Sequence, residues 1–225
     1  MKTLLITAFE PFGGESENPS ALALELLPET IGGIRLEKRL LEVTFLGAKD
    51  AVCRYVDEIK PDYAICLGQA GGRAAITPER VAINVMDARI ADNAGYKPED
   101  EPVVTGGANA HFATLPIKRM VSAMKRANVA AAVSNSAGTY VCNSTMYALL
   151  DHIAANSMAT KAGFIHVPYI PSQAADKPNM PSMPLEDMVK GLTAAIECID
   201  ELTNATGGCL KASSFLYAAF YAIII

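Results

Sequence analysis

The alternation of short apolar segments with segments of helical periodicity constrains the fold of this chain more than any other feature. Buried strands are expected at residues 3–8, 34–44, 63–67, 81–85, 129–133 and 163–167. Helices are expected at residues 20–27, 48–59, 117–127, 143–155 and 185–202. Regular alternation of this kind is typical of a mostly parallel sheet with helices on both faces. The sequence therefore predicts an α/β fold of that type.

Length and composition suit one large domain rather than two small ones. Of the 225 residues, 51% are hydrophobic, so a sizeable core can be buried. The net charge is −5 and the basic residues are scattered, which argues against a nucleic-acid partner. The apolar run after Lys2 stops at Glu10 without a small-residue cleavage site, so a first strand is expected rather than a signal peptide. No apolar stretch is long enough to cross a membrane.

The five cysteines are odd in number, widely spaced and without a CxxC pair. This pattern argues against a disulfide framework and against a zinc site. A reducing compartment is the simplest interpretation.

Two segments lie outside the alternation. Residues 92–114 are rich in Gly, Asn and Pro and are expected to form a long loop, which in a compact domain is usually functional or mobile. Residues 213–225 carry no charge and end in three isoleucines, a hazard for aggregation if exposed. We expect a single domain of residues 1–212 followed by this apolar extension. Its role as a packing segment or as a non-native addition stays open.

Cys142 stands out among the cysteines by its position. It follows the expected strand 129–133 and directly precedes the expected helix 143–155. Free N–H groups at a helix start stabilise anions, so the thiol pKa is expected to fall below its usual ~8.5. The same N–H groups could hold an oxyanion. The alternative is a small buried hydrophobic side chain, the usual role of a free cysteine.

Two further residues could complete a catalytic group with Cys142. His166 ends an expected strand and should reach the same edge of the sheet, whereas His111 and His152 are weaker candidates on a loop and a helix. Glu79 follows a glycine-rich turn and could orient the imidazole. From the residues alone, a surface ion pair between Glu79 and Arg80 is the preferred interpretation. The turn itself lacks the glycine spacing of a nucleotide-binding loop.

Taken together, these segments resemble the pyrrolidone-carboxylate peptidase family, the type I pyroglutamyl peptidases. The resemblance extends over nearly the whole chain up to about Leu210. The matching motifs are FEPFGG at 9–14 with NPS at 18–20, GQAGGR at 68–73, ITPERVAIN at 76–84, DARI at 87–90, SAGTYVCN at 136–143 and GFIHVPY at 163–169.

The resemblance implies a cysteine peptidase with a three-layer αβα fold and a mostly parallel, twisted central sheet. It would remove an N-terminal pyroglutamyl (5-oxoprolyl) residue from peptides through a thioester. Its catalytic residues would be Cys142, His166 and Glu79, and Arg89 would sit close to the oxyanion. The resemblance also implies a cytosolic location, no cofactor and a homotetramer. By the same mapping, the pocket for the ring would be lined by Phe9, Phe12, Thr44, Gln69, Ile90, Tyr140 and Val141.

The chain departs from the family pattern at two positions. Many members have Phe where this chain has Tyr140, whose hydroxyl needs a partner. Many have Pro where this chain has Ala91, so we expect this loop to be less rigid. Three other functions remain as alternatives: an amidase acting on another small cyclic amide, a glycosidic-bond phosphorylase, and a catalytically inactive binding protein.

Overall fold

A six-stranded, mostly parallel sheet forms the centre of the protein. The computed structural model describes residues 1–207, with side chains described through Ile199. The strand order is β2-β3-β1-β4-β8-β5. The four parallel strands are β3 (Ile34–Leu41), β1 (Lys2–Phe9), β4 (Tyr63–Gln69) and β8 (Lys161–Val167). Two short antiparallel strands flank them, β2 (Thr30–Ile31) beside β3 and β5 (Thr77–Pro78) beside β8.

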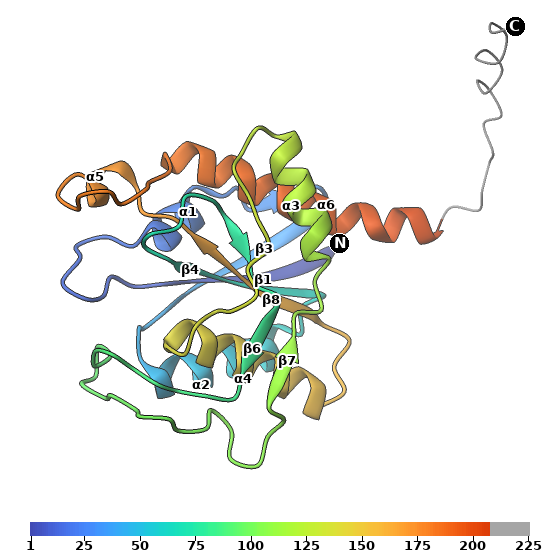
Figure 1. Ribbon diagram of the computed structural model, residues 1–225. Coiled ribbons are helices and arrows are strands. Elements are labelled where there is room, and N and C mark those ends of the chain that lie inside the picture. The colour runs from blue at the N-terminus through green and yellow to red at the C-terminus, as the bar shows by residue number, and fades with distance from the viewer. Residues whose placement is uncertain (208–225) are drawn as a thin grey trace, which may run out of the picture.

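Helices cover both faces of this sheet (Figure 1). One face carries α1 (Pro19–Leu26), α3 (Ile117–Arg126) and α6 (Leu185–Gly207), and the other carries α2 (Phe45–Ile59) and α4 (Val141–Ala155). A short helix, α5 (Pro171–Ala174), follows β8. The predicted layered α/β fold is therefore confirmed. Helix α4 begins two residues earlier than expected, so that Cys142 lies inside its first turn.

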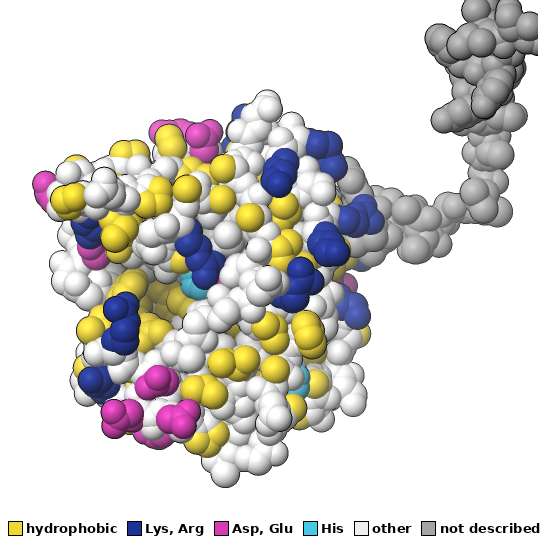
Figure 2. Space-filling model, viewed as in Figure 1, with side chains coloured by type: hydrophobic (Ala, Val, Ile, Leu, Met, Phe, Trp, Pro, Cys, Tyr) yellow, Lys and Arg dark blue, Asp and Glu magenta, His cyan; other side chains and the backbone are white. Residues whose placement is uncertain are grey.

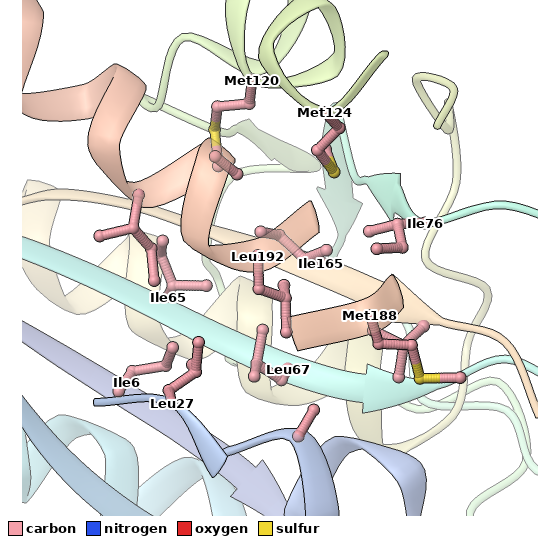
Figure 3. Close-up of a cluster of buried hydrophobic side chains, with 14 of the residues drawn as sticks. Ile6, Leu27, Ile65, Leu67, Ile76, Met120, Met124, Ile165, Met188 and Leu192 are labelled. Carbon is pink, nitrogen blue, oxygen red and sulfur yellow. The ribbon is translucent and has the colours of Figure 1, made fainter. Parts of the chain in front are cut away.

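The strands divide their side chains between two cores. In β1, Leu4 and Ile6 point into the core beneath α1, α3 and α6, whereas Leu5 and Phe9 point into the core beneath α2 and α4. This division follows the two-residue period of a strand. Figure 3 shows the first core, where side chains of β1, β4 and β8 meet those of α3 and α6. Burial on both faces explains why the parallel strands are almost continuously apolar.

The predicted strand at residues 129–133 is wrong in part. This segment runs parallel to residues 76–80, with Ile76 N donating to Ala130 O at 3.0 Å and Ser134 N donating to Pro78 O at 3.0 Å. Only isolated bridges form, between Ile76 and Ala131 and between Glu79 and Ser134. Pro78 has no N–H to give, so the ladder is interrupted between the two bridges.

The predicted strand at 81–85 exists but belongs to a second sheet. Strand β6 (Val81–Ile83) pairs antiparallel with β7 (Ala110–Phe112). The expected loop 92–114 therefore ends in a strand that packs beside α4 (Figure 1).

None of the helices within residues 1–207 is long and apolar enough to cross a membrane. The apolar extension 213–225 lies outside the described residues.

Candidate active site

The site forms where the chain leaves two adjacent strands in opposite directions. From β1 the chain crosses to β3, and from β4 it continues toward β8 on the other side. Such a switch opens a crevice at the carboxyl ends of the strands, where ligands of α/β sheets bind. The turns at residues 10–14 and 70–73 lie at this edge. Figure 2 shows a hollow on this face with hydrophobic side chains inside and a histidine at its border.

His166 and Glu79 form a buried contact at this edge. The short strand β5 pairs with β8 so that Thr77 lies opposite His166, and Glu79 follows two residues later. His166 Nδ1 lies 2.7 Å from Glu79 Oε1. Glu79 is 0% exposed and His166 is 4% exposed. The preferred surface ion pair is wrong, because Arg80 Nε instead donates to Asn135 Oδ1 at 2.7 Å.

A second cation contacts the same carboxylate oxygen. Arg73 Nη1 donates to Glu79 Oε1 at 2.6 Å and to Thr77 Oγ1 at 2.5 Å, and its Nη2 donates to the Ser136 carbonyl at 3.3 Å. Sequence reasoning gave Arg73 no role. The available signal was that Arg73 is the only charged residue of the Gly68–Arg73 turn.

Gly68 makes room for the thiol of Cys142. Gly68 lies opposite His166 in the register of β4 and β8. A Cβ atom at Gly68 would stand 3.0 Å from Cys142 Sγ and 2.7 Å from Phe164 Cζ. Because paired residues of adjacent strands project to the same face, the sulfur and the imidazole lie on one face of the sheet. Phe164 packs against His166 on this face, with ring centroids 4.7 Å apart.

The protonation of Cys142 differs from the sequence expectation. Burial, together with the charge of Glu79, raises the pKa of the Cys142 thiol to about 12, against a smaller lowering by Arg73. The backbone N–H of Cys142, in the first turn of α4, does lower the thiol pKa, but by less than burial raises it. Burial also lowers the pKa of His166, although its contact with Glu79 raises it. The resting site therefore holds a neutral thiol beside a neutral imidazole.

The carboxyl of Glu79 stays ionised in this buried place. Burial works against its charge, yet the hydrogen bonds with His166 and Arg73 hold the pKa of this carboxyl below its ordinary value. With Glu79 ionised, the proton of the imidazole lies on Nδ1, which faces the carboxylate. The opposite ring nitrogen, Nε2, is then able to accept a proton.

A small cavity adjoins the thiol. It measures about 20 Å³. Five predicted pocket residues line it together with Cys142, namely Phe9, Phe12, Gln69, Tyr140 and Val141. Asn18 and Val43 also line it and were not predicted. Thr44 is instead the N-cap residue of α2, and Arg89 and Ile90 are exposed on the neighbouring loop.

The two other histidines have acidic partners of their own. His111 Nε2 contacts Asp151 Oδ1 and His152 Nε2 contacts Asp57 Oδ1, each at 2.8 Å. Burial raises the pKa of the Cys53 and Cys66 thiols to about 12. The charges of Asp57 and Asp151, the partners of His152 and His111, raise the pKa of Cys53 further.

A family model and the sequences of known proteins match most of this chain. A family model described as pyroglutamyl peptidase matches residues 1–202. The pyrrolidone-carboxylate peptidase of Thermococcus onnurineus is 57% identical over 194 residues, 86% of this chain and 96% of the relative. That of Thermococcus kodakarensis is 54% identical over 198 residues, 88% of this chain and 96% of the relative.

Solved structures give the same result. The pyroglutamyl peptidase I of Bacillus amyloliquefaciens superposes with a TM-score of 0.86 at 40% identity, covering 89% of this chain and 98% of the other. The pyrrolidone carboxyl peptidase of Thermococcus litoralis superposes with a TM-score of 0.87 at 39% identity, covering 92% and 96%.

Proposed function

Because the chain belongs to the pyroglutamyl peptidase family, we propose that Cys142, His166 and Glu79 carry out the reaction of that family. The protein is a cysteine-type omega peptidase that removes an N-terminal pyroglutamyl residue from peptides. The observation that carries the residue assignment is the buried contact of His166 Nδ1 with Glu79 Oε1. His166 lies opposite Gly68 on the neighbouring strand, and the Cys142 sulfur packs against Gly68.

The first half of the reaction forms a thioester. His166 Nε2 takes the proton of the Cys142 thiol as the sulfur attacks the carbonyl carbon between the pyroglutamyl ring and the next residue. The carbon–nitrogen bond then breaks, and the imidazolium passes its proton to the departing amine. Glu79 holds the imidazole in the required tautomer and stabilises its cation. Transfer within the pair avoids releasing a free thiolate, which the raised pKa of Cys142 makes unfavourable.

The second half regenerates the thiol. Water attacks the thioester carbonyl while His166 Nε2 takes one of its protons. The carbon–sulfur bond breaks, the sulfur recovers a proton from the imidazolium, and pyroglutamate leaves. The oxygen anion formed in each half faces the first turn of α4, whose N–H groups have no intrahelical acceptor. The resemblance adds Arg89 as a residue close to this anion.

The cavity suits the head of the substrate. Phe9 and Phe12 supply flat apolar walls, and the end of β4 at Gln69 supplies backbone groups able to pair with the lactam amide. At about 20 Å³ the cavity has room for roughly one water molecule, so entry of the ring requires side chains at its mouth to move. Proline lacks the ring carbonyl and would leave buried polar groups unpaired, which is the basis for its rejection.

Three pocket residues rest on the resemblance rather than on the cavity. Arg89 and Ile90 lie on a loop tied to the segment before Cys142, since Thr139 Oγ1 donates to the Asp87 carbonyl at 2.8 Å. Ile90 is 53% exposed, so its side chain is available to cover a bound ring. Thr44 lies directly before α2, next to the cavity residue Val43. All three are proposed to contact substrate once it is bound.

The test is release of a fluorogenic amine from a pyroglutamyl amide, with a prolyl amide as the comparison substrate. We expect turnover of the first and little turnover of the second. Cys142→Ser should abolish turnover, whereas Cys53→Ser, which removes another partly buried thiol on α2, should leave it intact. Wild-type rates in Cys142→Ser would refute the assignment.

Assembly, location and domain extent are part of the proposal. The family resemblance supports a homotetramer in the cytoplasm, and the four described cysteines are free thiols, which fits a reducing compartment. The family match over residues 1–202 supports one peptidase domain within residues 1–212. Light scattering after size exclusion tests the tetramer.

A further inference from the structure

Glu79 Oε1 is shared between two positively polarised partners. His166 Nδ1 lies 2.7 Å away and Arg73 Nη1 lies 2.6 Å away. The carboxylate is fully buried, whereas the side chain of Arg73 is 30% exposed. Arg73 therefore lies between the buried carboxylate and solvent and contacts the same carboxylate oxygen as the histidine.

Arg73 also joins the three chain segments that build the site. It belongs to the turn after β4, it donates to Thr77 in β5, and it donates to the carbonyl of Ser136 in the segment that leads to Cys142. The guanidinium is planar, so its donors have fixed directions. Its contacts fix the carboxylate relative to that segment.

The three proposed catalytic groups carry a net negative charge during the reaction, which a fourth group must neutralise. When the thiol proton has moved to His166, the site holds a sulfur anion, an imidazolium and the Glu79 carboxylate, with a net charge of −1. Arg73 brings this sum to zero. An uncompensated charge in a buried site is costly, and low dielectric strengthens each of these interactions.

We propose that Arg73 is a positioning residue of the peptidase, which neutralises Glu79 and so sets the pH range in which Cys142 and His166 exchange a proton. The inference rests on the proposed roles of those two residues. Arg73 does not touch the substrate in this scheme. It acts through the carboxylate.

The direction of its effect follows from its charge. Arg73 lowers the pKa of the Cys142 thiol, and it also lowers the pKa of the His166 imidazole. Loss of a cation makes each proton of the pair bind more tightly. The acidic and the basic limb of the profile of kcat/KM against pH should therefore both move to higher pH, whichever of the two residues holds the proton.

Other titratable groups face the pair and remain in place when Arg73 is changed. The thiol of Cys66 lies close enough to Cys142 to raise its pKa, and Cys142 in turn raises the pKa of Tyr140. Within the described residues, the groups that perturb His166 are Glu79 and Arg73. Arg73 is thus the one cation acting on both members of the pair there.

The experiment compares Arg73→Gln, Arg73→Lys and the control Arg80→Gln. Arg80 is a neighbouring arginine that contacts Asn135 instead of Glu79. Two readouts are taken for each: kcat/KM against pH with a pyroglutamyl amide, and the rate of alkylation by iodoacetamide without substrate. Tryptic peptide 127–161 contains Cys142 as its single cysteine, so mass spectrometry reports this thiol alone.

Arg73→Gln should move both limbs to higher pH and slow alkylation near pH 7.5 about tenfold, the effect of one pKa unit. Arg73→Lys should keep the limbs at their wild-type positions with a lower kcat, and Arg80→Gln should resemble wild type. A folded Arg73→Gln protein with reduced activity but unmoved limbs would overturn the proposal, since a merely structural role lowers amplitude alone.

A second comparison tests the proposal in case the Arg73→Gln protein does not fold. Glu79→Gln removes the opposite charge and should move the alkylation profile to lower pH, while Glu79→Gln with Arg73→Gln should bring it back toward wild type. Identical profiles for these two would also overturn the proposal. Activity in Cys142→Ser would instead refute the proposed catalytic residues and leave the effect of Arg73 on the thiol standing.

Discussion

The hydroxyl of Tyr140 donates a hydrogen bond of 3.1 Å to the backbone carbonyl of Ala91. These are the two positions at which the resemblance predicts a departure from the family pattern, with Phe and Pro expected there. Tyr140 is the N-cap residue of α4 and lines the cavity beside Cys142, and Ala91 follows the exposed Ile90. A loop that proline would stiffen is here held by a hydrogen bond from a tyrosine, so we expect the two departures to compensate each other.

Tyr140→Phe should therefore loosen this loop without emptying the cavity. We expect KM for a pyroglutamyl amide to rise about two- to fivefold and stability to fall by at most about 1 kcal/mol, the usual value of one hydrogen bond. Adding Ala91→Pro should restore KM in the Tyr140→Phe protein. A double-mutant cycle checks this, and additive effects of the two changes would contradict the compensation.

Gly68→Ala should separate the sulfur from its working position. Its Cβ would stand 3.0 Å from Cys142 Sγ and 2.7 Å from the buried Phe164 ring, which cannot both give way. We expect kcat/KM to fall at least about tenfold, with stability reduced by roughly 1–3 kcal/mol from overpacking. Gly163→Ala is the matched control, because its Cβ would meet Leu115 Cδ1 at 3.0 Å in the other core. That variant should lose stability but keep its activity.

Glu79→Gln should leave a slow enzyme. The amide can present its NH₂ group to His166 Nδ1 and so favour the wrong tautomer, with an expected fall in kcat of roughly 10²-fold or more and little change in KM. Asp151→Asn removes the corresponding carboxylate from the His111 contact and should not change kcat. Equal effects of the two substitutions in steady-state assays would count against a special role for Glu79.

Stability should rise with pH through the range where His166 changes its charge. Its pKa is lowered on folding from the ordinary 6.5, so the unfolded chain binds a proton that the folded protein does not. The contribution of His166 is complete above pH 6.5 and is lost as pH falls below that value, by at most about 1.4 kcal/mol per pH unit. The pKa of Glu79 is lowered from 4.5, so its contribution is lost only at lower pH.

Urea unfolding at pH 7 and pH 5.5 measures this slope. His166→Gln should reduce the difference between the two unfolding free energies, while His152→Gln, on the partly exposed end of α4, serves as the control. The idea fails if His166→Gln keeps the full wild-type slope.

The candidate site could be located from sequence because its parts sit at strand ends. The alternation of apolar strands and periodic helices predicted the sheet, and the carboxyl ends of its strands predicted one edge for Cys142 and His166. The roles came from the family motifs. Five of the eight predicted pocket residues line the cavity: Phe9, Phe12, Gln69, Tyr140 and Val141. They lie at or next to the ends of β1 and β4 and the start of α4, which meet at this edge.

Local pattern could not reveal which charges meet. Glu79 has Arg80 as its neighbour in sequence but Arg73 and His166 as its partners in space. The alternation of side chains along an extended segment turns Arg80 away, and the pairing of β5 with β8 brings Glu79 to the histidine. Residues 129–133 showed the same limit, since the missing N–H of Pro78 in a distant segment interrupted their ladder.

The sequence by itself determined the layers, the order of most elements and the choice of Cys142 as the candidate thiol, because apolar periodicity, turn residues and motifs are local features of the sequence. Only the tertiary structure decided the protonation of that thiol. The desolvation of Cys142 and the charges of Glu79 and Arg73 arise from segments tens of residues apart, and their balance raises a pKa that the helix start alone would have lowered.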